Sequence, residues 1–208
     1  MNLENFALLI CNGVPPSPER LRKLLPNPTK IVCADGGANK ARLIGLEPDL
    51  IVGDLDSLDQ SDGAFPNAEI VRIPSQDNTD FEKTLDLLLE RGQTHLLIAS
   101  FSGGRIDQTL ANVQIAYEYS KRCNPVLADD EYLIIPVTHR LKERVRPEEL
   151  ISLLPMEDNT VVSTKGLAYE LNRTSIPKGG HGISNRAVDE EIEIDVHRGG
   201  VLVFVKDI

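Results

Sequence analysis

Short apolar runs alternate with amphipathic stretches through the first 128 residues. The apolar runs have the length of buried strands and cover 7–11, 30–34, 50–52 and 96–99. The stretches between and after them carry helical signals, and they cover 19–25, 40–44, 81–91 and 108–121. Strands that alternate with helices form a parallel sheet covered on both faces. Residues 1–128 are therefore predicted to form an α/β domain with a Rossmann-like, three-layer architecture.

The pattern changes after Ala128. Short runs of β type follow one another, and they cover 132–137, 150–154, 160–163, 187–196 and 201–205. Within 190–196 (EEIEIDV) the apolar residues recur at every second position, so one face of this strand is predicted to be buried and the other solvated. Residues 129–208 are predicted to form a second, small antiparallel all-β domain.

Composition places the chain among ordinary globular proteins. Its 208 residues weigh 22.9 kDa, with 41% hydrophobic and 26% charged residues. A chain of this mass buries about 70% of its surface on folding, so a core without disulfide staples is expected. Aromatic residues make up 4% and Trp is absent, so this core must be aliphatic. The three cysteines are widely spaced and fit neither a disulfide framework nor a zinc site.

The charge and the longest apolar runs exclude several classes of function. A formal net charge of -10 opposes nucleic-acid binding, because that binding depends on neutralising phosphates. Every apolar run is far shorter than the roughly 20 residues of a membrane span. The first five residues, MNLEN, lack the basic flank of a signal peptide. We therefore expect a cytoplasmic protein without a nucleic-acid or membrane partner.

Two loops that follow apolar runs contain paired glycines, DGGAN at 35–39 and SFSGGRIDQ at 100–108. Paired glycines permit a tight turn and a close approach of the backbone to a ligand. The free N–H groups of a helix start and the planar guanidinium of Arg105 suit phosphate. Each loop by itself also fits a plain strand-to-helix turn with Asp35 or Asp107 as the cap. The P-loop and dinucleotide-binding fingerprints are both absent from the sequence.

Two carboxylates end the third apolar run, at Asp54 and Asp56 of GDLDS (53–57). In extended backbone, residues two positions apart project to the same side. Like charges this close favour a cation between them, and hard carboxylate oxygens suit Mg²⁺. A solvated acidic loop is the alternative interpretation.

The segment QDNTDFEK (76–83) opens the third predicted helix. Thr79 and Glu82 have the spacing of a capping box, and Asp80 in the first turn suits the positive end of the helix. Helix capping explains these three residues, but it does not explain Gln76 and Asp77 just before them.

If the sheet is parallel, all these clusters lie at the same edge, beyond the carboxyl ends of the strands. Open parallel sheets bind their ligands at this edge. At that edge, Asp80 would complete a carboxylate set with Asp54 and Asp56. Lys83 would then face a phosphate group.

Taken in this order, DGGAN, GDLDS, QDNTDFEK and GGRIDQ resemble the thiamine pyrophosphokinase (thiamine diphosphokinase) family. Later blocks at 152–155, 165–171 and 182–185 and a final strand at 200–205 extend the resemblance to about residues 8–205. The resemblance implies a β-sandwich as the second domain and a homodimer with active sites between subunits. It also implies a Mg²⁺-dependent reaction of ATP with thiamine that gives AMP and thiamine diphosphate.

The resemblance also assigns roles to individual residues. The implied catalytic residues are Asp54, Asp56, Asp80, Lys83 and Arg105. Mg²⁺ would be held by Asp54, Asp56 and Asp80, with Asp77 nearby. ATP would be bound by Asp35, Gly36, Gly37, Asn39, Lys83, Gly103, Gly104 and Arg105. Thiamine would be approached by Gln76, Asp107, Gln108, Ser184 and Asn185. In this interpretation residues 1–128 carry ATP, Mg²⁺ and catalysis, and residues 129–208 bind thiamine.

Other readings of the same residues remain open. One is a Mg²⁺-dependent kinase or pyrophosphokinase for a different hydroxymethyl heterocycle. Another is a sensor that binds nucleotide or thiamine without turnover. The sequence does not identify a strong general base, and Asp80 or Asp107 could accept the proton late in the reaction.

Overall fold

The structure is a computed structural model that describes residues 5–25, 27–59 and 63–206. Backbone contacts divide the chain between Asp130 and Glu131 into an N-terminal and a C-terminal unit. The prediction that a signal peptide is absent was based on the first five residues. Of these, Met1 to Glu4 lie outside the described residues. Within the described ranges, no helix is long and apolar enough to cross a membrane.

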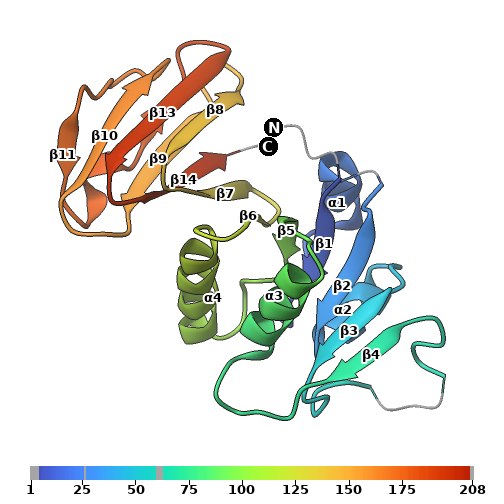
Figure 1. The fold of residues 1–208 in the computed structure, drawn as a ribbon. Coiled ribbons are helices and arrows are strands. Elements are labelled where there is room, and N and C mark those ends of the chain that lie inside the picture. The colour runs from blue at the N-terminus through green and yellow to red at the C-terminus, as the bar shows by residue number, and fades with distance from the viewer. Residues whose placement is uncertain (1–4, 26, 60–62, 207–208) are drawn as a thin grey trace. The chain divides into compact units, whose positions relative to one another are not determined.

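Strands and helices alternate along the N-terminal unit, except that the fourth strand directly follows the third in the order of elements (Figure 1). Its elements are β1 (Ala7–Ile10), α1 (Pro18–Leu24), β2 (Lys30–Ala34), α2 (Gly37–Leu43), β3 (Leu50–Gly53), β4 (Glu69–Arg72), α3 (Asp80–Glu90), β5 (His95–Ala99), α4 (Ile106–Tyr119) and β6 (Asn124–Ala128). The strands pair in the order β6-β5-β1-β2-β3-β4, and each pair is parallel. This arrangement confirms the α/β prediction for the first part of the chain.

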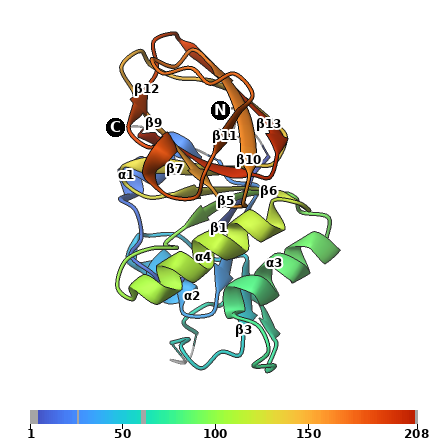
Figure 2. The same ribbon diagram turned by 90° about the vertical axis from the view of Figure 1, so that its left-hand side faces the viewer.

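The order of the strands creates a switch point between β1 and β5. From β1 the chain adds β2, β3 and β4 on one side, and it then crosses back to place β5 on the other side of β1. Right-handed crossovers in opposite directions put their helices on opposite faces of the sheet. Helices α3 and α4 accordingly lie side by side over one face (Figure 2). Ligand sites of open parallel sheets lie at such switch points, beyond the carboxyl ends of the strands.

The core of this unit explains its apolar runs. β1 and β3 are buried along their whole length, and so are all residues of β5 after His95. Strands covered on both faces become nearly continuous apolar runs, which is why the sequence revealed them. Cys11, Cys33 and Cys123 are free, in agreement with a sequence that shows no disulfide framework, and all three are buried. Burial raises the pKa of the Cys123 thiol to about 11, so this sulfur stays protonated at neutral pH.

The C-terminal unit consists of two antiparallel layers of strands. Its strands are β7 (Tyr132–Val137), β8 (Arg140–Arg144), β9 (Leu150–Pro155), β10 (Thr160–Lys165), β11 (Thr174–Ile176), β12 (Asn185–Arg186), β13 (Glu191–Arg198) and β14 (Val201–Lys206), with a 3₁₀ turn at Gly180–Gly182. One layer has the order β12-β9-β14-β7, and the other has β11-β10-β13-β8. The two layers form the β-sandwich that the resemblance implied.

Strand β13 shows the predicted alternation. Ile192 and Ile194 are buried, whereas Glu193 points outward and pairs with Arg140 and Lys142 of β8. The predicted run over 187–196 is nevertheless wrong at its start, because β13 begins only at Glu191 and Ala187 forms an isolated bridge with Leu167.

Several strands had no apolar signal. β4 lies at the edge of its sheet with mostly exposed residues, and β8 is built from RLKER. Edge position and one-sided burial remove the apolar pattern on which a sequence prediction depends. Helix α2 also begins at Gly37, earlier than the predicted 40–44. Helix α4 covers Ile106–Tyr119, two residues earlier at each end than predicted.

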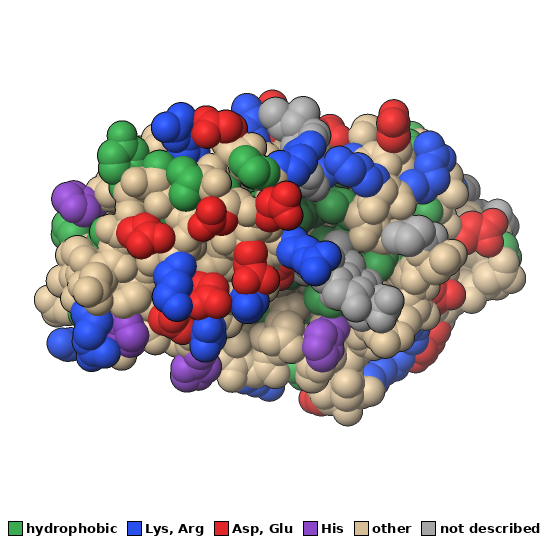
Figure 3. Space-filling view, turned by 90° about the horizontal axis from the view of Figure 1, so that it is seen from above, with side chains coloured by type: hydrophobic (Ala, Val, Ile, Leu, Met, Phe, Trp, Pro, Cys, Tyr) green, Lys and Arg blue, Asp and Glu red, His purple; other side chains and the backbone are tan. Residues whose placement is uncertain are grey.

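Charged side chains of both signs are interspersed on the face seen in Figure 3, and hydrophobic side chains occur there in small groups. Several ion pairs of the C-terminal unit illustrate the mixing, such as Lys142 with Glu191 and Arg186 with Glu148 at 2.8 Å each. The net negative charge is therefore not gathered into a single-sign surface on this face.

Candidate functional site

Three carboxylates meet at the carboxyl ends of two neighbouring strands. Asp35 follows β2, and Asp54 and Asp56 follow β3. One oxygen of each carboxylate lies within 4.8 Å of the others. Asp54 and Asp56 belong to the predicted metal set of Asp54, Asp56 and Asp80, with Asp77 nearby, whereas Asp35 was predicted to bind ATP. The tertiary structure thus places Asp35 beside two of the predicted metal ligands.

A turn brings Asp54 and Asp56 together. β3 ends at Gly53, and Leu55 has a φ of 70°, in the left-handed region. The Asp56 N–H donates to Asp54 Oδ1 at 3.1 Å and closes the turn. The prediction that extended backbone aligns the two carboxylates is wrong, because a short acidic side chain that accepts a nearby backbone N–H competes with strand geometry. Gly53 permits the close packing here, since a Cβ on it would lie 2.7 Å from Asp35 Cβ.

Asp35 is the buried member of the set, with 4% of its surface exposed. Its Oδ2 accepts a hydrogen bond from the Ser57 N–H at 3.1 Å, while its Oδ1 is buried without a hydrogen-bond partner. Burial raises the pKa of Asp35, and the neighbouring acidic side chains raise it further. An unpartnered buried carboxylate oxygen beside two more carboxylates is the donor set that a hard divalent cation such as Mg²⁺ requires.

Asp54 is held in its ionised form. Gln76 Nε2 donates to Asp54 Oδ2 at 2.8 Å, and this bond together with the Asp56 N–H lowers the pKa of Asp54. Gln76, predicted to approach thiamine, therefore contacts a predicted metal ligand. Asp77, which follows Gln76, accepts a hydrogen bond from the Ser75 hydroxyl at 2.7 Å.

Asp80 lies beside the acidic set at the first position of α3. Its Oδ1 accepts from the Asp54 N–H at 3.3 Å and from Lys83 Nζ at 2.8 Å. Lys83 has only 5% of its side chain exposed. The structure thus brings Asp80 next to Asp54 as predicted, but it gives Lys83 a carboxylate partner within the protein.

Helix α3 is oriented by its own first turn. Thr79 accepts from the Glu82 N–H, and Glu82 accepts from the Thr79 N–H at 2.9 Å, so the predicted capping box is present. The buried face of the helix, with Phe81 and Leu85, packs against the core. Capping and core packing together place Asp80 at the strand ends.

The second glycine-rich loop leads from β5 into α4. Gly103 and Gly104 both have positive φ, and Arg105 is the N-cap residue of the helix. Arg105 forms a two-pronged ion pair with Asp107, and this pairing lowers the pKa of Asp107. Asp107 is not the cap that the plain-turn interpretation required. Arg105 has 70% of its side chain exposed, so its guanidinium is accessible to an anionic ligand.

The loop after β1 also reaches this edge, and the sequence analysis missed it. The Gly13 N–H donates to the Ser100 carbonyl, and the Val14 N–H donates to the Ser102 carbonyl, each at 2.7 Å. The side chain of Asn12 packs against Gly36 of the DGGAN loop. The available signal was the Asn12-Gly13 pair directly after an apolar run, which shares with the other loops a glycine close to the end of a strand.

Two predicted thiamine residues lie in the C-terminal unit. Ser184 has a φ of 62°, and its N–H donates to the Ser152 hydroxyl at 3.0 Å. The Asn185 amide holds the backbone of Tyr169 at both ends, accepting from its N–H at 3.1 Å and donating to its carbonyl at 2.8 Å. The Tyr169 side chain is exposed.

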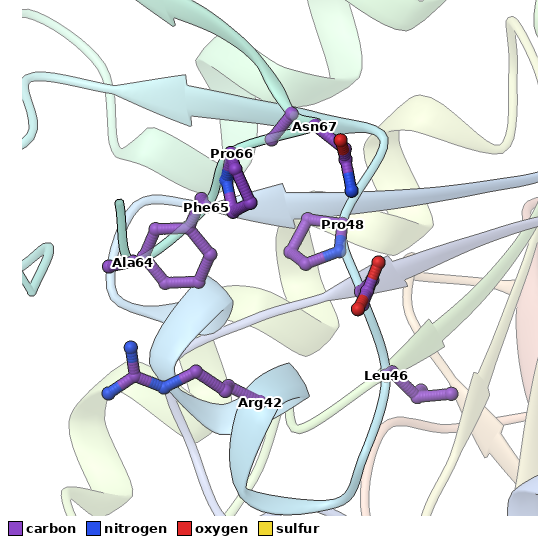
Figure 4. A pocket seen from close by; sticks show the side chains of 9 residues that line it. Arg42, Leu46, Pro48, Ala64, Phe65, Pro66 and Asn67 are labelled. Carbon is purple, nitrogen blue, oxygen red and sulfur yellow. The ribbon is translucent and has the colours of Figure 1, made fainter. Parts of the chain in front are cut away.

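A hollow of about 100 Å³ lies near the opposite ends of β3 and β4 (Figure 4). Phe65 and Pro48 line it, and the Arg42 guanidinium lies 5.6 Å from the centre of the Phe65 ring. Its volume is below the roughly 300 to 1,000 Å³ typical of ligand pockets. This hollow is therefore not the candidate site, and the acidic set at the carboxyl edge of the sheet remains the candidate.

Two protein-family models match the chain. The model described as thiamin pyrophosphokinase, catalytic domain, matches residues 21–128, and that described as thiamin pyrophosphokinase, vitamin B1 binding domain, matches residues 138–201. The chain belongs to the thiamine pyrophosphokinase family. Its Asp54, Asp56, Asp80 and Arg105 all fall within the catalytic-domain match.

Curated members of the family resemble the chain over most of its length. Thiamine pyrophosphokinase 1 of Oryza sativa subsp. japonica is 30% identical over 190 residues, which cover 77% of this chain and 72% of the rice protein. Thiamin pyrophosphokinase 1 of Caenorhabditis elegans is 26% identical, with 85% of this chain and 80% of that protein covered.

Solved structures of the family share the fold. The thiamine pyrophosphokinase of Bacillus subtilis superposes with a TM-score of 0.84 at 22% identity, covering 96% of this chain and 98% of that chain. Thiamin pyrophosphokinase from Candida albicans gives a TM-score of 0.81 at 21% identity, covering 99% and 90%. These likenesses confirm an α/β unit followed by an antiparallel β-sandwich.

Proposed function

We propose that the protein is a thiamine pyrophosphokinase that transfers the pyrophosphoryl group of ATP to the hydroxyl of thiamine, giving AMP and thiamine diphosphate. Membership of the family supports this activity. The observation that carries it is the meeting of Asp35, Asp54 and Asp56 at the strand ends, with one buried oxygen left without a partner.

The acidic set is the proposed metal site. Asp54 and Asp56 supply oxygens to Mg²⁺, Asp35 is the third donor, and Asp80 is the neighbouring carboxylate, with Asp77 farther along the chain. When bound, Mg²⁺ would neutralise part of the phosphate charge and polarise the group under attack. The lowered pKa of Asp54 supports this role, because a ligand must be ionised to bind a cation.

The loops around the acidic set are proposed to bind ATP. The first loop offers Asp35, Gly36 and Gly37, and the second offers Gly103, Gly104 and Arg105, with Lys83 beside Asp80. Arg105 would exchange its Asp107 partner for phosphate oxygens, since a guanidinium fork matches both. Arg105 and Lys83 would then stabilise the negative charge that develops as the β-phosphorus is attacked.

Thiamine is proposed to contact Gln76, Asp107, Gln108, Ser184 and Asn185. Its thiazolium ring is cationic and therefore suits a site rich in carboxylates. Asp107 is a weak base while Arg105 lowers its pKa, so its proposed use as a late proton acceptor requires Arg105 to move to phosphate first.

We propose that the enzyme acts as a cytoplasmic homodimer. The family resemblance supports the dimer, and exposed apolar side chains of α4, Ile106 and Leu110, offer a surface that association would bury.

The test is a product assay with ATP, Mg²⁺ and thiamine, followed by ³¹P NMR and chromatography. AMP and thiamine diphosphate are expected in equal amounts. The matched control is Asp54→Asn, which keeps the shape of the side chain, removes its charge and is expected to abolish turnover at low Mg²⁺. Near-normal activity of this variant at low Mg²⁺ would reject Asp54 as a ligand.

The same assay separates the alternatives. ADP in place of AMP would indicate an ordinary kinase. Turnover of another hydroxymethyl heterocycle, with thiamine inert, would change the acceptor. Saturable binding of ATP or thiamine without any product would indicate a sensor.

A further inference from the structure

Helix α2 is connected to the acidic turn by one asparagine. Asn39 Nδ2 donates to the Ser57 carbonyl at 2.8 Å, and Asn39 Oδ1 accepts from the Asp59 N–H at 3.0 Å. Both ends of the amide thus bind backbone groups of the segment that follows Asp56. On its other side, the Ser57 peptide donates its N–H to Asp35 at 3.1 Å. Two residues of the DGGAN motif therefore bind the backbone of Ser57, with Asn39 at its carbonyl and Asp35 at its N–H.

The turn that contains Asp54 and Asp56 includes a strained backbone position. Leu55, between Asp54 and Asp56, has a φ of 70°, and such a conformation costs a non-glycine residue about 1 kcal/mol or more. Strained backbone persists only when surrounding contacts over-determine it. Asp54 is fixed by Gln76 on one side of Leu55, and the Ser57 peptide is fixed by Asn39 on the other.

We propose that Asn39 is a positioning residue that holds the 54–59 turn in the geometry needed to bind a divalent cation. The inference rests on the proposed function, because it concerns the proposed Mg²⁺ site. It changes the role predicted for Asn39 from an ATP contact to a support of the carboxylates that hold the metal. Groups that orient metal ligands typically contribute a factor of about 10 to 100 in metal affinity.

A second contact of α2 with the same segment is peripheral. Arg42 pairs with Asp59 at 2.7 Å, but both side chains are substantially exposed. Exposed ion pairs contribute little. The amide of Asn39 is therefore the specific connection between α2 and the turn.

The experiment compares cation binding by the full chain and its variants, with Mn²⁺ alone as an EPR probe and no nucleotide present. Asn39→Ala removes both hydrogen bonds and keeps a good helix former in α2. Asn39→Ser, which is too short to span both backbone groups, repeats the test. Leu43→Ala is the matched control, because Leu43 is an exposed residue of the same helix. Asp54→Asn is the reference for loss of a ligand.

The expected result is a rise of about tenfold in the Mn²⁺ dissociation constant for both Asn39 variants and no change for Leu43→Ala. In steady-state assays the Mg²⁺ concentration for half-maximal rate should rise by the same factor, while KM for ATP at saturating Mg²⁺ stays unchanged. A purely structural role would lower only the melting temperature.

Unchanged Mn²⁺ binding in both Asn39 variants would overturn the inference but would not contradict the proposed function. If KM for ATP rose in those same variants, Asn39 would be a nucleotide contact. Equal Mn²⁺ binding by the wild type and Asp54→Asn is a different failure. It would remove the metal site of the proposed function, and the role of Asn39 with it.

Discussion

Strained residues mark the ends of three strands in the N-terminal unit. Asp35 after β2, Leu55 after β3 and Ser100 after β5 have φ values of 41°, 70° and 56°. Non-glycine residues in this region cluster at functional sites, where the surrounding structure compensates their cost. Each of these residues follows the carboxyl end of its strand, at the edge where the candidate site lies.

The first prediction concerns the stability cost of Asp35. Its raised pKa means that the ionised form is less favourable in the folded than in the unfolded state. Stability should therefore fall as pH rises from the ordinary aspartate pKa through the raised value. Asp35→Asn, which keeps the acceptor for Ser57, is therefore expected to raise the free energy of unfolding of the metal-free protein above that window.

Thermal unfolding in EDTA at pH 8 and near pH 3.5 measures this effect. The difference between variant and wild type should shrink at the lower pH, and the variant should gain no stability from added Mg²⁺. A variant less stable than wild type at pH 8 would show that the ionised Asp35 carboxylate does not destabilise the folded protein.

Arg105 provides the second prediction. Removal of a donor that stabilises transition-state charge costs about 2 to 4 kcal/mol, so Arg105→Ala should lower kcat by roughly 30- to 1,000-fold. Steady-state rates at saturating ATP and Mg²⁺ measure it. Arg91→Ala is the control, since Arg91 is also ion-paired through its guanidinium but to Glu69. Equal rates for the two variants would remove Arg105 from the phosphate site.

At the scale of elements, α3 connects folding to chemistry. Its capping box fixes the start of the helix at Asp80, and its buried residues fix its face. The carboxylate of Asp80 then reaches the backbone of Asp54, which is 26 residues away in sequence. The sequence predicted the start of this helix, because a capping box is a local motif.

The end of the same helix provides the third prediction. Gly92 follows the C-cap Arg91 with a φ of 76°, and a Cβ on it would meet nothing within 4 Å. Gly92→Ala therefore tests backbone strain alone, and we expect a loss of about 1 kcal/mol and a melting temperature about 2 to 4 °C lower. Gly180→Ala is the control, because Gly180 lies outside the positive-φ region and has room for a Cβ. Equal melting temperatures for the two variants would contradict this account of the helix end.

At the scale of the whole molecule, the exposed apolar side chains provide the fourth prediction. Ile106 and Leu110 lie one turn apart on α4, and Val14 packs over Gly103 just before that helix. Light scattering after size exclusion should give twice the 22.9 kDa of the chain. Leu110→Lys is expected to shift the protein toward monomer, because a charge in a buried apolar interface is costly.

Leu43→Lys is the control for this measurement, because Leu43 is the exposed leucine of α2 and lies outside the α4 surface. This control should keep the dimer mass. A monomeric wild type, or a dimer that both variants leave intact, would exclude the α4 surface as the interface.

The α/β class and the antiparallel second unit followed from the pattern of apolar residues alone. Buried parallel strands such as β3 and β5 are continuous apolar runs, and β13 alternates. Edge strands such as β4 and β8 were not predicted, because their exposed residues do not form an apolar pattern. A strand shows an apolar pattern in the sequence only where its side chains are buried against the rest of the fold.

The chemical groups that follow each strand could be identified before the fold was known: Asp35 follows one strand, Asp54 and Asp56 follow the next, and Arg105 precedes a helix. Which of these groups meet was set by the folding of the chain. The fold placed Asp35 with Asp54 and Asp56, brought Asp80 to the backbone of Asp54, and directed Asn39 to the backbone of the acidic turn. The reason is that local motifs are set by neighbours in the chain, whereas contacts between loops depend on which strands pair and how the backbone turns at their ends.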